Sequence, residues 1–187
     1  MIGTLRITLA FCMMFLLAVG AQAEKLENEN VLAGLPDGFK VAASGRNSNV
    51  GQTEFIPADE SMDDWTRMIT VTITFGTTNA DPGIASKRLA DAFTQACPAS
   101  TTSPVTTGIE NGYPVSIWLY ACDLNPATGK PEAFLSKYVG GRDSLYNVQY
   151  TFRSELTNEK VIEASKYLRA VMVCDTRLKD RPCPAGM

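Results

Sequence analysis

The chain of 187 residues contains no histidine. Histidine is the most common general base and metal ligand near neutral pH, and Ser–His and Cys–His nucleophile pairs require it. Two neighbouring serine–lysine pairs remain as a candidate nucleophile and base, Ser136–Lys137 and Ser165–Lys166. Neighbours in a strand point to opposite faces, and neighbours on a helix diverge by about 100°. We therefore interpret both pairs as ordinary solvated polar residues and assign no catalytic residue and no cofactor.

The densest group of carboxylates is a cluster of four acidic residues followed by a tryptophan. It comprises Asp59, Glu60, Asp63, Asp64 and Trp65. Carboxylates bind calcium, but the spacing differs from that of a calcium-binding loop. Acidic side chains also interact favourably with the positive end of a helix dipole. We interpret the cluster as a helix start or a contact surface for a partner, and we assign no metal. Paired carboxylates from distant segments, as in glycoside hydrolases, stay an open alternative.

Aromatic residues recur on segments that alternate between apolar and polar positions. They are Trp65, Trp118, Tyr113, Tyr120, Tyr138, Tyr146, Tyr150 and Phe152. Aromatic residues at alternating strand positions usually form cross-strand pairs or core contacts. We favour that interpretation, and an aromatic groove for a ligand is the alternative.

Four cysteines follow the N-terminal apolar segment: Cys97, Cys122, Cys174 and Cys183. An even number in an exported chain indicates disulfides. Three connectivities are open, and we favour Cys97–Cys122 with Cys174–Cys183, because each pair joins the end of a regular element to the next cysteine along the chain. A zinc site is disfavoured because the chain has neither histidine nor a C-x-x-C motif.

Residues 1–23 have the pattern of a cleavable signal peptide. Arg6 precedes the apolar run 7–19, and Ala21 and Ala23 form a small-residue cleavage motif. A membrane-spanning helix needs about 20 apolar residues, and this run is shorter. We predict cleavage after Ala23 and a periplasmic or secreted protein. The formal net charge is −3, and no basic block is present, which is not typical of nucleic-acid or anionic-membrane binding.

Periodicity predicts one α+β domain over residues 35–187, after a flexible segment at 24–34 with room for one helical turn. An antiparallel sheet of six or seven strands with two or three helices packed on it is expected. The predicted strands are 39–43, 52–56, 69–75, 106–109, 114–121, 132–139 and 144–152. The predicted helices are a short one from Ser61, a second at 83–96 and a third at 158–173, with loops at 99–107 and 123–131. Helices on opposite faces would bury both sides of strand 114–121.

Part of the chain resembles the opening of small proteins of the PsbP/Mog1-like superfamily. The residues that carry this resemblance are Leu35-Pro36-Asp37-Gly38-Phe39, Glu54-Phe55-Ile56-Pro57, and Asp64-Trp65 before the strand 70–75. The four cysteines and the tail lie outside the pattern and indicate an exported, disulfide-stapled branch. The resemblance implies a Mog1/PsbP-like fold and an accessory, binding or assembly role, and it supplies no catalytic residues.

These observations predict a non-enzymatic accessory or binding protein of the cell envelope, with an envelope or secreted protein as its partner. A histidine-free hydrolase that uses carboxylates is one alternative. A periplasmic inhibitor or immunity protein is another. Buried, paired acids in a cleft would favour the enzyme, whereas an exposed apolar patch would favour the binding protein.

Overall fold

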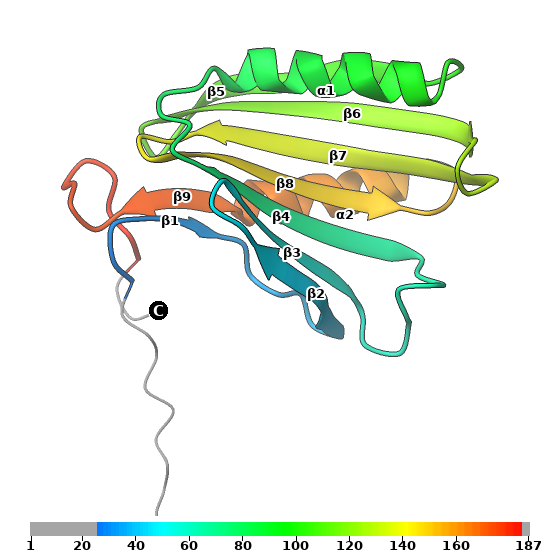
Figure 1. The fold of residues 1–187 in the computed structure, drawn as a ribbon, viewed down its shortest axis with the longest axis horizontal. Coiled ribbons are helices and arrows are strands. Elements are labelled where there is room, and N and C mark those ends of the chain that lie inside the picture. Colours follow the sequence, from blue (N-terminus) through cyan, green and yellow to red (C-terminus); the bar gives the residue numbers. More distant parts are fainter. Residues whose placement is uncertain (1–25, 185–187) are drawn as a thin grey trace, which may run out of the picture.

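The computed structural model describes residues 26–184, so the predicted signal peptide lies outside the described residues. Seven antiparallel strands form the main sheet, in the order β2-β3-β4-β8-β7-β6-β5, and β1 pairs with β9 in a small second sheet (Figure 1). The elements are β1 (Glu29–Leu32), β2 (Phe39–Arg46), β3 (Val50–Pro57), β4 (Arg67–Phe75), α1 (Pro82–Ala96), β5 (Thr101–Glu110), β6 (Tyr113–Asn125), β7 (Lys130–Gly140), β8 (Ser144–Phe152), α2 (Asn158–Ala170) and β9 (Met172–Asp175). The predicted α+β class with an antiparallel sheet is confirmed.

The two helices cover opposite faces of the main sheet (Figure 1). On the face that we call the α1 face, the Tyr120 hydroxyl donates to the Ser86 carbonyl at 3.0 Å, and Phe93 packs edge-on against Tyr120. On the α2 face, Leu168 packs in the core with Ile117 of β6. Strand β6 is therefore covered on both sides, as its sequence predicts.

The core on the α2 face follows from the alternation of strand residues. Every second residue of β8, from Tyr146 to Phe152, is buried on this side. Leu135 of β7 and Ile69 of β4 lie in the same layer with no exposed surface. Apolar side chains at a period of two thus form a continuous layer beneath α2.

The loop before β4 corrects one prediction, because residues 59–66 form turns and bends instead of the short helix expected from Ser61. The Glu60 carboxylate accepts hydrogen bonds from the Thr66 backbone N–H at 2.7 Å and from the Thr66 hydroxyl at 2.6 Å. Trp65 packs in a small core with Ile56, and the Arg153 guanidinium lies 3.9 Å from its ring centroid. These contacts stabilise a loop at residues 59–66, although the local sequence pattern predicts a helix.

Four other segments predicted as irregular, flexible or helical contain strands. The expected loop 99–107 lies mostly within β5, an edge strand with a register shift after Pro104. The expected helix 158–173 ends at Ala170, and its last residues enter β9. The segment 24–34, expected to be flexible, contains β1, which pairs with β9 from Glu29 to Leu32. Strands β6 and β7 also extend into the expected loop 123–131. Strands β1 and β9 are partners from opposite ends of the described chain, whereas β5 and β7 pair with β6 in local hairpins.

Two disulfides join the ends of regular elements, with the connectivity favoured by the sequence. Cys97 caps the C-terminus of α1 and bonds Cys122 of β6, with 6.2 Å between their Cα atoms. Cys174 of β9 bonds Cys183 in the tail, with 4.8 Å between their Cα atoms. The first bridge fastens α1 to the sheet, and the second closes the C-terminal tail onto β9.

Candidate functional site

A pocket of about 400 Å³ lies between α2 and the strands β2, β4 and β8 on the α2 face. We call it the aromatic pocket. It is lined by Pro36, Asp37, Phe39, Arg67, Tyr150, Glu163, Lys166, Tyr167 and Ala170. A concave site of this size, with aromatic walls and a few polar groups, has the usual composition of a small-molecule site.

Local sequence features place each wall of the pocket. Gly38 takes a φ of 78° in the turn before β2, and the Phe39 N–H donates to the Pro36 carbonyl at 3.1 Å. Glycine adopts such a φ without strain. The turn that it allows directs the chain into β2 at the edge of the pocket. The pocket side of α2 presents Glu163, Lys166, Tyr167 and Ala170, whose spacing of three, four and seven places them on one helix face.

A carboxylate inside this pocket joins a cation and a phenol. Glu163 Oε1 accepts a hydrogen bond from Arg67 Nη1 at 3.1 Å and another from the Tyr150 hydroxyl. The Arg67 guanidinium lies 5.4 Å from the centroid of the Phe39 ring. The side chains of Arg67 and Glu163 are each 41% exposed. The ion pair is therefore held in place by two aromatic residues but is still open to solvent and to a ligand.

The third aromatic wall carries a polar group without a partner. The Tyr167 hydroxyl is shielded from solvent and makes no hydrogen bond, and its ring lies 5.5 Å from that of Tyr150. Burial raises the pKa of Tyr167 to about 12. Burial, followed by the hydrogen bond and charge of Glu163, also raises the pKa of Tyr150. Both phenols are protonated at neutral pH and do not act as bases, and only the Tyr150 hydroxyl donates a hydrogen bond.

Most of this pocket was not predicted from the sequence. Tyr150 was noted only among the strand aromatics, and Phe39 only within the turn that carries the family resemblance. Arg67 and Glu163 are separated by 96 residues, so no local pattern connects them. The available signal was the spacing of four between Glu163 and Tyr167, which places a charged and an aromatic residue on one helix face.

The acidic cluster after β3 starts no helix in the structure, and its role as a contact surface for a partner stays a prediction. Asp59, Asp63 and Asp64 are exposed, and Asp64 forms a weak ion pair with Lys130 at 3.4 Å. Trp65 is only 7% exposed, so it belongs to the core and offers little surface to a partner. The helix-start role of these acids is wrong, since no helix begins here. Among residues 26–184, no group of three or more potential ligands could hold a metal ion.

The serine–lysine pairs also differ from a nucleophile and its base. Ser136 accepts a hydrogen bond from Asn147 Nδ2 at 2.6 Å on the α1 face. Lys137 points to the α2 face, where it donates to the carbonyls of Leu168 at 3.0 Å and Val171 at 2.8 Å and pairs with Glu110. The opposite orientation follows the prediction, but the expected solvation of this pair is wrong, because both side chains are buried. Lys137 stabilises the carbonyl end of α2.

For the second pair, Ser165 is half-buried and Lys166 is exposed, at the rim of the aromatic pocket.

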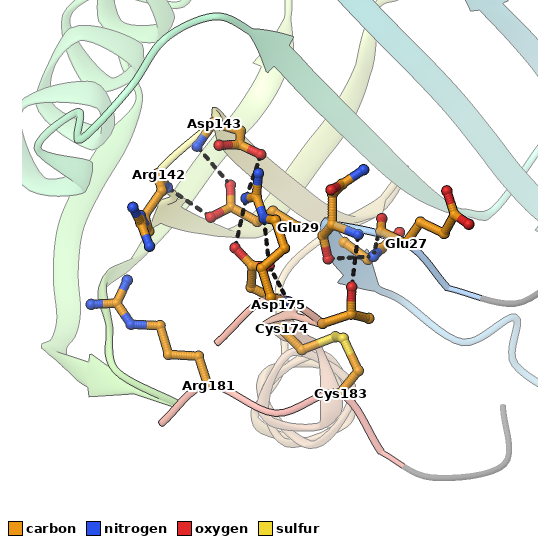
Figure 2. A network of polar contacts seen from close by, with 12 residues as sticks. Glu27, Glu29, Arg142, Asp143, Cys174, Asp175, Arg181 and Cys183 are labelled. Atoms are coloured by element: carbon orange, nitrogen blue, oxygen red, sulfur yellow. Dashed lines mark hydrogen bonds and ion pairs between the residues drawn. A yellow bond between two sulfur atoms is a disulfide. The ribbon is translucent and has the colours of Figure 1, made fainter. Parts of the chain in front are cut away.

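A second polar cluster lies at the turn between β7 and β8 (Figure 2). We call it the turn network, and it comprises Glu29, Arg142, Asp143, Tyr146, Asp175 and Arg177. The Glu29 carboxylate accepts hydrogen bonds from the backbone N–H groups of Arg142 at 2.7 Å and Asp143 at 3.0 Å, and from the Tyr146 hydroxyl at 3.0 Å.

The rest of the turn network joins the tail to the sheet. Arg177 donates to both carboxylate oxygens of the buried Asp175 and to Asp143 at 2.7 Å. The hydrogen bonds from Arg177 hold the pKa of Asp175 below its ordinary value, against the opposing effect of burial. Because its carboxylates are already bonded within the protein, we assign this network a structural role: it fastens β1, β9 and the tail to the main sheet.

Comparison with known proteins gives little further information. The sequence matches no known protein family and no curated protein. Among solved structures, it is similar to LpqN of Mycobacterium tuberculosis, described as involved in cell envelope biogenesis, with 9% identity and a TM-score of 0.47 over 80% of this chain and 86% of LpqN. A likeness at this level supports no conclusion about function. The resemblance to the PsbP/Mog1-like superfamily stays a prediction. Within the described residues, no helix has the length and apolarity that crossing a membrane requires.

Proposed function

We propose that this chain is an exported binding protein without a catalytic centre of its own and that the aromatic pocket is its ligand site. The observation that carries this proposal is a pocket of about 400 Å³ whose aromatic walls surround the solvent-accessible ion pair Arg67–Glu163. Pockets of this kind combine apolar contact area with a small number of orienting polar groups.

The non-catalytic part of the proposal is supported by the state of the reactive side chains. Lys137 is fixed by two carbonyls and a carboxylate, so its amine is unavailable as a base. Tyr167, with a pKa of about 12, keeps its proton at neutral pH. The chain also lacks histidine. These features favour a role in ligand binding for the polar side chains over a role in proton transfer.

Export and an envelope role are supported by the pattern of residues 1–23 and by two disulfides. Disulfides persist in oxidising compartments and are rare in the cytosol. In this proposal the protein works in the periplasm or outside the cell, where it holds its ligand or presents it to an envelope or secreted protein.

The pocket is tested by filling it. Ala170 is exposed at the pocket wall, so Ala170→Trp occupies the cavity without removing a contact. Ala92 is an exposed alanine of α1, and Ala92→Trp is the matched control. With the neutral fluorophore N-phenyl-1-naphthylamine, we expect saturable binding by the oxidised wild type and by Ala92→Trp, and loss of binding by Ala170→Trp.

Equal binding by all three proteins, with unchanged melting temperatures, would place the site elsewhere and overturn the proposal. Turnover of a glycan, ester or peptide by the purified protein, abolished in a folded Glu163→Gln variant, would overturn its non-catalytic part.

A further inference from the structure

We propose that the ligand of the aromatic pocket is a neutral aromatic ring bearing an amide-type edge, that is, a hydrogen-bond acceptor and a donor side by side, as in an aryl carboxamide. This inference rests on the proposed function, because it takes the aromatic pocket as the ligand site. Charge, hydrogen-bonding capacity and ring geometry each contribute to it.

The charges around the pocket balance. The lining carries two acids, Asp37 and Glu163, and two cations, Arg67 and Lys166. Arg67 and Glu163 neutralise each other at 3.1 Å. A charged ligand would have to compete with this pair and leave one of its members without its counter-ion. The pocket therefore favours a ligand without net charge.

The ion pair leaves a donor and an acceptor unused. Both hydrogen bonds to Glu163 end on Oε1, and among the described residues Oε2 accepts none. Arg67 donates a side-chain hydrogen bond only through Nη1 within the same part of the chain, so Nε and Nη2 are unused. Both side chains are 41% exposed, which makes these atoms accessible. An amide offers the matching donor to the carboxylate and the matching acceptor to the guanidinium.

The aromatic walls are arranged to receive a ring. Phe39 and Tyr150 have centroids 6.5 Å apart with planes tilted by 48°, and Tyr150 and Tyr167 have centroids 5.5 Å apart with a tilt of 37°. The walls are tilted with respect to one another rather than stacked in parallel, and aromatic pairs favour offset and edge-to-face contacts of this kind.

Four probes that share one ring and differ in their substituent test the inference: benzamide, benzoate, benzylammonium and toluene. Backbone amide shifts of the ¹⁵N-labelled, oxidised protein report where each probe binds and its Kd. We expect the residues of the aromatic pocket to respond to benzamide with a Kd at least tenfold lower than for the other three probes. The ranking is measured on the wild type, so it does not depend on any variant folding.

Charge-changing variants then reverse the preference. Glu163→Gln leaves Arg67 without its counter-ion, and we expect benzoate to bind at least as tightly as benzamide. Arg67→Gln leaves Glu163 unpaired, and we expect benzylammonium to gain in the same way. The exposed ion pair Lys87–Asp91 on α1 provides the matched controls, Lys87→Gln and Asp91→Asn, which should keep the wild-type ranking.

The outcomes separate this inference from the proposed function. If none of the four probes shifts the pocket residues and the naphthylamine probe also fails, the pocket is not a ligand site and both statements fall. If an aromatic probe binds in the pocket but benzoate, benzylammonium or toluene equals or exceeds benzamide in the wild type, the pocket keeps its role and the amide inference is overturned.

Discussion

Two tyrosines on the same face of β8 each donate a hydrogen bond to a glutamate, yet the two carboxylates differ in their surroundings. Tyr146 donates to Glu29. Glu29 also accepts hydrogen bonds from the backbone N–H groups of Arg142 and Asp143 (Figure 2). Tyr150, four residues along the strand, donates to Glu163, whose second oxygen accepts no hydrogen bond from the described residues. The hydrogen bonds to the Glu29 carboxylate all come from within the protein and hold its elements together. The Glu163 carboxylate has an oxygen that is free of such bonds within the described residues and can accept a hydrogen bond from a ligand.

The region around Glu29 still contains two buried atoms without a hydrogen-bond partner in the described part of the chain. The Tyr113 hydroxyl and Arg181 Nε are buried without hydrogen bonds, and the Arg181 guanidinium lies 4.5 Å from the centroid of the Tyr113 ring. Burial, with the nearby charge of Glu29, raises the pKa of Tyr113 to about 12. The Tyr113 and Tyr167 hydroxyls are both shielded from solvent, although the residue Tyr167 lines a pocket. A buried polar atom without a partner therefore does not by itself indicate a ligand site.

The largest expected effect concerns the tail that closes over the turn network. The double substitution Cys174→Ser and Cys183→Ser removes a bridge across a short loop, which contributes about 3 kcal/mol to the free energy of unfolding in the chain-entropy model. For a domain of this size, about 3 kcal/mol corresponds to a fall of about 6–12 °C in Tm. Circular-dichroism melting measures it, and binding of the naphthylamine probe at low temperature should be unchanged.

A control uses the remaining disulfide. Dithiothreitol should lower the Tm of this double variant further, through Cys97–Cys122. A variant that melts like the wild type, or that loses probe binding while still folded, would contradict the expectation that the tail stabilises the fold and does not contribute to binding in the aromatic pocket.

The carboxylate of Glu29 is expected to have the next largest effect. Glu29→Ala leaves two backbone N–H groups and the Tyr146 hydroxyl without their acceptor, and hydrogen bonds to a charged group contribute about 1.5–3 kcal/mol. We expect a loss of stability of that order in urea unfolding. Glu27, two residues away and exposed, provides the control Glu27→Ala, which should leave the midpoint unchanged. Equal effects of the two substitutions would mean that the turn network contributes no specific stability.

The pH dependence of stability tests the other carboxylate of the turn network. Arg177 lowers the pKa of Asp175 in the folded protein, so this stabilisation is fully present above the ordinary value of 3.8 and is lost as the pH falls through the lower folded value. Asp175→Asn should therefore melt below the wild type at pH 6, and the difference should shrink below pH 3.8. Asp123→Asn, at an exposed position, is the control. A difference that stays constant with pH would refute this linkage.

Much of the fold follows from local pattern. The alternation of apolar residues predicts β4 and β8 correctly, and the predicted helices 83–96 and 158–173 correspond to α1 and α2. The preferred cysteine pairing also follows from neighbours in sequence. Strands β1 and β9 were missed because each finds its partner at the far end of the chain. The loop at Trp65 was missed because its stabilising contacts are tertiary.

The aromatic pocket was less accessible to sequence reasoning than the fold. Its ion pair joins Arg67 at the start of β4 to Glu163 on α2, and only the strand order and the position of α2 bring these residues together. The acidic cluster was a candidate site because its residues are close together in sequence. Like charges repel one another, however, and Asp59, Asp63 and Asp64 are exposed to solvent. A ligand site requires side chains that converge in space, and residues that are neighbours in sequence need not converge.

The smallest expected effect on stability, and the sharpest contrast with Glu29, belongs to Tyr167→Phe. The lost hydroxyl has no partner, so its removal leaves no other group unsatisfied and relieves the cost of a buried polar atom. We expect a Tm equal to that of the wild type or slightly higher, and unchanged affinities for benzamide and toluene, because the hydroxyl is shielded from solvent and out of reach of a ligand. Tyr146→Phe is the matched control, because it removes a hydroxyl that does have a partner: it should lower Tm and leave benzamide binding intact. A destabilised Tyr167→Phe, or a folded Tyr167→Phe that loses benzamide binding, would contradict the assignment of this hydroxyl as a buried group without a partner.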